Sequence, residues 1–149
     1  MGIGTFREQL KAAIGTSVTS GAYTLTAATG VVVGYDDQGA AGTLVSGIGT
    51  SAAKMWIQPG ELTGIDPDIR SLRTWTVVCD LYFGFARETD NTFADIEGLI
   101  EAILARWDDK ANFSGTGRPD EVTARLESVD VKQSPCFAHY VIEVRKKVC

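Results

Sequence analysis

The stretch RTWTVVCDLYFGFA, from Arg73 to Ala86, decides the fold. Apolar and polar residues alternate along it, and this period of two is typical of a β-strand. One face carries the larger apolar side chains: Trp75, Val77, Cys79, Leu81, Phe83 and Phe85. The other face carries Thr76, Val78, Asp80 and Tyr82. Because burial of aromatic and leucine side chains gains much free energy, we expect this stretch to be the central strand of a sheet.

Residues 92–108 show the period of an amphipathic helix. It starts at a capping signal, Thr92-Phe93-Ala94-Asp95. Its apolar stripe follows helical spacing: Phe93, Ile96, Ile100, Ile103, Leu104 and Trp107, with Leu99 on the flank. The sequence therefore predicts a helix that packs this stripe against the strand and ends near Asp108.

The opposite side of this predicted helix carries the small residues Ala94, Gly98 and Ala102. A glycine inside a helix costs about 1 kcal/mol relative to alanine, so Gly98 needs an explanation. We expect Gly98 and Ala102 to allow the close approach of another backbone, which makes both residues candidate contacts with another subunit. The alternative is that alanines are simply favourable on an exposed helix surface.

A second helix is predicted near the start of the chain. Thr5-Phe6-Arg7-Glu8 matches a capping box, and Gly15 is a helix stop signal. The apolar residues share one face: Ile3, Phe6, Leu10, Ala13 and Ile14. Arg7, Glu8 and Lys11 fall off that face, so this segment also predicts a helix with one buried side.

Shorter signals predict the other strands. After a short polar segment, the run from Ala27 to Tyr35 contains three consecutive valines, which favour a strand. Residues 54–58 predict a strand that stops at Pro59-Gly60, and residues 59–72 predict a polar loop.

The C-terminal part predicts two strands. Val122, Ala124 and Leu126 alternate in one phase and Val129 and Val131 in the other, so a β-bulge or bend is expected near Ser128. The last strand is expected from about residue 136 to 147, with one apolar face: Ala138, Tyr140, Ile142 and Val144. The whole chain, residues 1–149, thus predicts a single α+β domain, with a mainly antiparallel sheet of four to five strands and two helices on one face.

One segment does not fit this scheme. QGAAGTLVSGIGTSAAKMW, from Gln38 to Trp56, has no charge before Lys54 and is rich in glycine, alanine and serine. We expect residues 36–58 to form a flexible arm or hairpin, because long loops in compact domains usually have a function. Its apolar residues are candidate contacts with another subunit: Leu44, Val45 and Ile48. The alternative is an intramolecular hairpin beside the strand at residues 54–58.

Composition excludes several classes of partner. The net charge of −5 argues against non-specific nucleic-acid binding and against docking on an acidic membrane. The sequence lacks an apolar stretch long enough to span a bilayer, and its first residues do not resemble a signal peptide. Three widely spaced cysteines do not form a disulfide framework, which indicates reduced thiols and a cytosolic fold.

The residues offer little for catalysis. The single histidine, His139, is three residues from Cys136 on one predicted strand, so their side chains should point to opposite faces. Cys79 is expected in the core, and the acidic loop Asp66-Pro67-Asp68 does not match a calcium loop. The glycines near Gly47 lack the Gly-Lys-Ser/Thr sequence of a phosphate loop. We therefore expect no catalytic residues, no metal site and no cofactor.

The chain resembles small tail-terminator and neck (tail-completion) proteins of long-tailed bacteriophages. The stretches that carry the resemblance are TFREQLKAAI, RTWTVVCDLYFGFARETDNTFADIEGLIEAILARW, EVTARLESVDVKQ and FAHYVIEVRKKV. The resemblance implies a non-enzymatic structural virion protein, made in the host cytoplasm, that forms a homo-oligomeric ring, usually a hexamer. It also implies that the ring caps the tail tube, contacts the tail tube protein and the head-neck connector protein, and lets DNA pass through its lumen without specific binding.

Three alternatives stay open. The first is another phage head-tail connector or tail-tube protein, because such proteins have similar small folds. The second, from a different class, is a small-ligand-binding or hydrolytic α+β enzyme with a cavity lined by Trp75, Phe83, Phe85 and Trp107. The third is a toxin-system or adaptor module that binds one protein partner.

Overall fold

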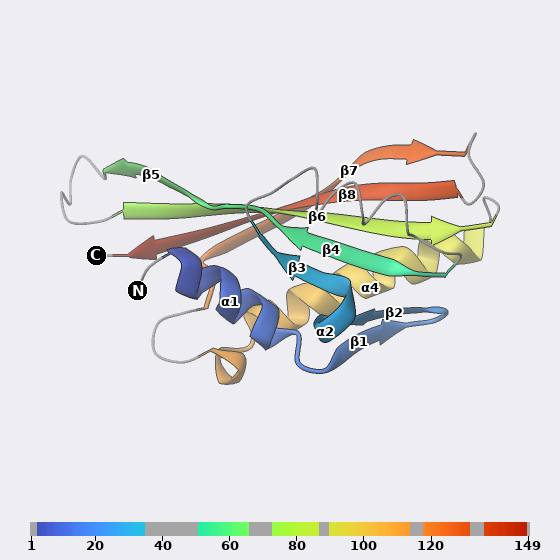
Figure 1. Ribbon diagram of the computed structural model, residues 1–149, viewed down its shortest axis with the longest axis horizontal. Coiled ribbons are helices and arrows are strands. Elements are labelled where there is room, and N and C mark those ends of the chain that lie inside the picture. Colours follow the sequence, from blue (N-terminus) through green and yellow to red (C-terminus); the bar gives the residue numbers. More distant parts are fainter. Residues whose placement is uncertain are drawn as a thin grey trace.

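The stretch from Arg73 to Phe85 forms β6, the long central strand of a six-stranded sheet (Figure 1). The computed structural model describes residues 3–34, 51–65, 73–86, 90–113, 118–131 and 136–148. β6 pairs antiparallel with β8 (Cys136–Val148) over its whole length, from Arg73 opposite Val148 to Phe85 opposite Cys136. The predicted central strand is therefore confirmed.

The other strands attach to this pair. On the second edge of β6, β4 (Ala53–Ile57) and β5 (Glu61–Ile65) occupy successive parts of the strand, both antiparallel. β3 (Val31–Val33) lies parallel to β4, and β7 (Glu121–Asp130) pairs antiparallel with β8. The order across the sheet is β3-β4-β6-β8-β7, with β5 beside β6.

The helices of the described residues lie on one side of this sheet (Figure 1). They are α1 (Ile3–Ala13), the short α2 (Ala27–Gly30), α4 (Asp90–Asp108) and the 3-10 turn η1 (Lys110–Asn112). A separate two-stranded hairpin, β1 (Ser17–Ser20) and β2 (Tyr23–Thr26), lies on the same side and packs against α4. The predicted α+β class and the packing of the two long helices on one face are confirmed.

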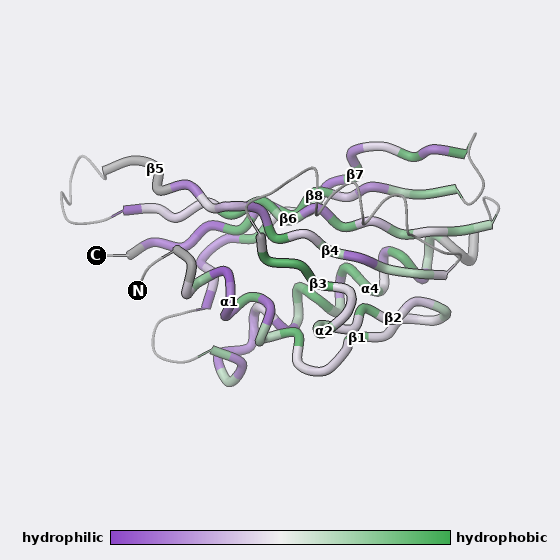
Figure 2. Tube along the Cα trace, in the orientation of Figure 1, coloured by the Kyte–Doolittle hydropathy of each residue, from purple (hydrophilic) through white to green (hydrophobic). Residues whose placement is uncertain are grey.

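The core lies between the sheet and these helices. Its fully buried side chains include those of Phe6, Leu10, Met55, Leu81, Phe83, Ile96, Leu99, Ile103 and Trp107. Figure 2 shows hydrophobic residues along α4 and the middle of the sheet. Hydrophilic residues lie at the start of β6 and the end of β8, near the C-terminus. The indole N–H of Trp107 donates to the backbone oxygen of Leu10 at 2.9 Å, which ties α4 to α1.

Arg7 corrects the prediction for the first helix. The sequence placed it off the apolar face, but Arg7 is only 2% exposed. Its Nη2 donates to the backbone oxygens of Gly34, at 2.8 Å, and Ile57, at 2.6 Å. Gly34 directly follows β3 and Ile57 ends β4, so the guanidinium supplies a donor to backbone oxygens at the ends of both strands. The helix also begins at Ile3, so Thr5 lies inside it and the predicted capping box is wrong.

Three segments predicted as loop or as a long strand have a different structure. The polar segment before Ala27 forms the β1–β2 hairpin, whose two-residue turn has Gly21 at a φ of +55°. The polar loop after Pro59 contains β5, and the strand predicted from Ala27 is divided between α2 and β3. In the described part of the chain the main sheet therefore has six strands instead of four to five.

The predicted arm is partly core. Residues 53–57 of the segment 36–58 form β4, with Ala53, Met55 and Ile57 fully or almost fully buried against the helices. A strand was expected at this position, and the flexible arm or hairpin over residues 36–58 stays a prediction for the rest of the segment. Residues 35–50 lie outside the described residues, so the arm prediction is untested there.

Tyr23 gives the fold a defined pH response. Its hydroxyl donates to the backbone oxygen of Gly84 at 2.9 Å, and burial, with a smaller effect of Asp95, raises its pKa from 10.0 to about 12. Between these values the unfolded chain releases the Tyr23 proton and the folded chain keeps it. The free energy of unfolding should therefore fall as the pH rises from about 10 to about 12.

We predict that Tyr23→Phe lowers the free energy of unfolding at pH 7 by about 1 kcal/mol, because the hydrogen bond to Gly84 is lost. The same variant should lose less stability than the wild type when the pH is raised through the alkaline range. Urea unfolding at pH 7, 10 and 11 measures both effects. An equally steep alkaline loss in the two proteins would contradict the assignment to Tyr23.

Candidate assembly surface

β7 is the least covered strand of the sheet. Of its ten residues, all but Val122 and Asp130 are exposed. Within the described ranges it pairs with β8 alone, so its outer edge has no strand beside it. The register shift between Leu126 and Ser128 confirms the predicted bulge. An edge strand with both faces in solvent is a ready template for pairing with another chain.

Apolar side chains gather at the C-terminal half of this strand and at the residue that follows it. Leu126 is 48% exposed, Val129 38% and Val131 51%, and we call these three residues the β7 patch. Leu126 lies opposite Tyr140, and Val129 opposite Ala138, so both belong to the face that carries the helices. Clustered exposed apolar residues indicate an interaction site, whereas isolated ones are common on any protein.

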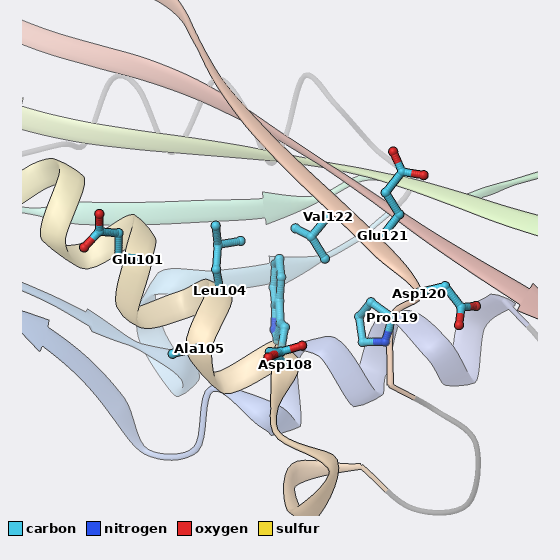
Figure 3. A pocket seen from close by; sticks show the side chains of 9 residues that line it. Glu101, Leu104, Ala105, Asp108, Pro119, Asp120, Glu121 and Val122 are labelled. Atoms are coloured by element: carbon cyan, nitrogen blue, oxygen red, sulfur yellow. The ribbon is translucent and has the colours of Figure 1, made fainter.

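A cleft of about 420 Å³ lies between α4 and the start of β7 (Figure 3). Leu104, Trp107, Pro119 and Val122 give it apolar walls, and four carboxylates complete the lining: Glu101, Asp108, Asp120 and Glu121. Its lining has no thiol, hydroxyl, imidazole or amine, so carboxylates are its only ionisable groups. This lining favours an apolar or cationic side chain over an anionic substrate.

Basic residues of the same chain already approach the cleft carboxylates. Lys146 Nζ lies 3.5 Å from Asp120 and Arg145 Nη1 lies 3.8 Å from Glu121. The backbone N–H of Lys147 also donates to Asp120 at 2.6 Å. These contacts of the basic run 145–147 hold the start of β7 against β8, which fixes the outer strand at one end.

A polar cluster lies on the sheet face opposite the helices. His139 Nε2 lies 2.7 Å from an oxygen of Asp80, whose other oxygen accepts from Gln58. The imidazole stacks on the ring of Tyr82, with ring centres 4.4 Å apart. Asp80 is 6% exposed, so this cluster satisfies a buried carboxylate.

The cluster does not extend to a nucleophile. In the described part of the chain, no hydroxyl or thiol hydrogen-bonds to His139, and Cys136 lies on the helix side of β8, as predicted. Cys79 is fully buried, and burial raises the pKa of its thiol well above the usual range, which confirms it as a core residue. Nor does any group of three His, Cys, Asp or Glu side chains among the described residues suit a metal ion.

The five residues predicted as contacts have different outcomes. Leu44, Val45 and Ile48 lie outside the described residues. Ala102 is half-buried and packs against the core, and Gly98 faces the β1–β2 hairpin of the same chain. A Cβ on Gly98 would overlap the hydroxyl of Ser20 and lie 3.5 Å from its Cβ. The close approach predicted at Gly98 therefore occurs within the chain, and a contact of Gly98 or Ala102 with another subunit stays a prediction.

The sequence contained the residues of the β7 patch but gave no sign that they are exposed. Alternating valines and leucines look the same whether or not a helix covers them.

Comparison of the chain with protein-family models and with curated proteins gave no match in either case. None of the helices in the described ranges is long and apolar enough to cross a membrane.

Gly98 allows a direct test of its intramolecular role. Gly98→Ala should change the free energy of unfolding little, because a helix gain of about 1 kcal/mol is offset by the overlap with Ser20. The double variant Gly98→Ala/Ser20→Ala should be more stable than Gly98→Ala alone, because the overlapping hydroxyl is gone. Chemical unfolding measures both, with Ser20→Ala as the control. Additive effects of the two substitutions would contradict this contact.

Proposed function

We propose that this chain is a non-enzymatic structural protein of a long-tailed bacteriophage, the tail terminator. In this proposal it forms a homo-oligomeric ring, six-membered by its resemblance to the family, that caps the tail tube and joins it to the head-neck complex. The observation that supports it best is β7, an edge strand exposed on both faces with an apolar patch. Such a surface is typical of a contact with another protein and not of a substrate-binding site.

The proposed partners follow from the ring. One face contacts the tail tube protein and the other the head-neck connector protein, while neighbouring copies contact each other. The net charge of −5 suits a lumen that DNA crosses without being held, because each neutralised phosphate would add affinity. The protein would be made in the host cytoplasm and end in the virion, with no membrane partner. Another connector or tail-tube protein is the nearest alternative within the class.

We predict that purified tails carry a ring of this protein at the end that joins the head. Electron microscopy of tails, with antibody labelling of the chain, locates the ring, and mass measurement of the isolated protein tests self-association in solution. Tails that lack the protein, together with a strictly monomeric chain at high concentration, would contradict the proposal.

Two observations favour a second candidate, a small-ligand-binding or hydrolytic enzyme. The first is the Asp80–His139 pair, because a carboxylate that orients an imidazole is a common part of catalytic sites. The second is the indole N–H of Trp56, which is buried and has no hydrogen-bond partner among the described residues. Trp56 lies opposite Asp80 on the next strand, so both are on one face, and unsatisfied buried donors are rare.

His139→Ala separates the two candidates. If the protein is a tail component, this variant should assemble on tails as the wild type does, at some loss of stability because Asp80 loses a partner. If the protein is an enzyme, turnover of ester or phosphoester substrates should be measurable in the wild type and absent in the folded variant. Cys136→Ala is the matched control, since its thiol lies on the other face of the sheet.

A further inference from the structure

The outer edge of β7 is complementary to a second copy of itself. We propose that two copies of this chain pair their β7 strands antiparallel about a two-fold axis at Leu126, so that their sheets become one. Such an axis is perpendicular to the sheet, so the helices of both copies lie on the same side. β7 is the border strand of the sheet (Figure 1), and its outer edge can take another strand without displacing an existing pair.

The bulge in β7 decides how its positions are counted. The register with β8 steps over Glu127, between Leu126 and Ser128. Ser128 lies opposite His139, so it is on the sheet face away from the helices. Glu127 reaches the same face, because its carboxylate lies 3.4 Å from Nε of Arg125. Glu127 and Ser128 together therefore occupy one position of the strand.

On the face that carries the helices, this count pairs apolar residues alone. Leu126 lies opposite Leu126 of the second copy, and the next pair on this face is Ala124 with Val129. The pair after that is Val122 with Val131, and the two-fold axis makes each of these outer pairs occur twice. All three residues of the exposed β7 patch thus meet apolar partners, which removes their area from water.

On the other face the charges are complementary. Arg125 lies opposite the position of Glu127 and Ser128 in the second copy, and the axis repeats this contact. The side chains of Arg125 and Glu127 are 61% and 48% exposed, so both can reach across the axis. Four charges of alternating sign then surround it, and opposite charges on facing strands are stabilising. The next pair outward is Thr123 with Asp130, in which the hydroxyl can donate to the carboxylate.

The charges also select this register over its neighbours. Facing residues of paired strands share one side of the sheet, so the register can change only by two positions at a time. One such shift places Arg125 opposite Arg125 of the second copy, and the opposite shift places Glu127 opposite Glu127. Like charges directly opposite each other are destabilising, and larger shifts shorten the contact. The register with Leu126 at the axis is therefore the favoured one.

This pairing goes beyond the proposed function and does not rest on it. A two-fold contact is complete at two copies, whereas a ring needs a contact that repeats from subunit to subunit. The pair covers an edge that would otherwise be open to aggregation. Dilution separates it into free subunits whose β7 edge is exposed, and the pair has to separate in this way before β7 can meet a neighbour in a ring.

A charge exchange between two chains tests the register. Arg125→Glu and Glu127→Arg should each raise the dissociation constant of the pair roughly five- to tenfold, because each sets like charges against each other twice. An equimolar mixture of these two variants should pair as tightly as the wild type. In the mixed pair every contact across the axis joins opposite charges again, although each chain keeps its own like charges.

Sedimentation velocity over a range of concentrations measures these dissociation constants, and thermal unfolding of each variant checks the fold. Glu8→Arg, on the exposed surface of α1, is the matched charge control and should leave the pairing unchanged.

Leu126→Cys gives an independent readout. Facing residues of antiparallel strands have Cα atoms about 4.5–5.5 Å apart, which a disulfide can span. Cys79 and Cys136 are buried, so a Cys149→Ser background leaves the new thiol as the reactive one. Oxidation should link Leu126→Cys chains into dimers roughly tenfold faster than Val32→Cys chains, because Val32 is an exposed valine of β3 outside the contact.

Three results would overturn the two-fold pairing. They are a mixture that pairs no better than the single charge variants, Leu126→Cys chains that cross-link no faster than Val32→Cys chains, and a wild type that stays a single subunit at high concentration. A ring on tails would leave the proposed function standing in all three cases. Tails without a ring would instead contradict the proposed function and leave a measured β7 pair intact.

Discussion

The antiparallel pairing of β6 with β8 is the interaction on which the rest of the structure depends. It extends over thirteen residues of each strand, and β4, β5 and β7 each pair with one of the two, while β3 attaches through β4. Their shared apolar face, with Leu81 and Phe83 on β6 and Ile142 on β8, is the surface on which α1 and α4 pack. Without this pair the chain would have no central strands for its sheet and no apolar sheet face on which the helices could pack.

This arrangement also explains why one strand is left exposed. The two long helices and the β1–β2 hairpin cover the centre of the sheet, and Trp107 fixes α4 to α1 through its bond to Leu10. β7 lies beyond α4, separated from it at one end by the carboxylate-lined cleft. Its apolar residues therefore contribute little to the core of a single subunit. Their burial requires a surface that the described residues of one copy do not offer to its own β7.

Much of the fold could be predicted because the spacing of apolar residues along a helix or strand reflects which of its faces is buried. The alternation around Cys79 identified β6, the stripe ending at Trp107 identified α4, and the phase change near Ser128 identified the bulge. Arg7 could not be predicted in the same way, because its burial depends on carbonyls of residues far away in the chain. The β1–β2 hairpin has a local signal in the sequence, because Val18-Thr19 and Tyr23-Thr24 flank a glycine-containing turn.

The candidate surface was less predictable than the fold. Gly98 was correctly expected to need a close neighbour, but a sequence does not say whether that neighbour is in the same chain. The exposure of Leu126 and Val129 depends on how far α4 extends over the sheet. That extent is set by the packing of all the elements together and not by the local sequence.

The central claim is that β7 becomes an inner strand when copies of this chain assemble. Hydrogen–deuterium exchange of the backbone amides of residues 121–131 tests it most directly, with the free subunit compared with the assembled ring. The account predicts amides on the outer edge of β7 that exchange fast in the free subunit and slowly in the ring, while β6 is protected in both. Equal exchange of β7 in the two states would contradict it.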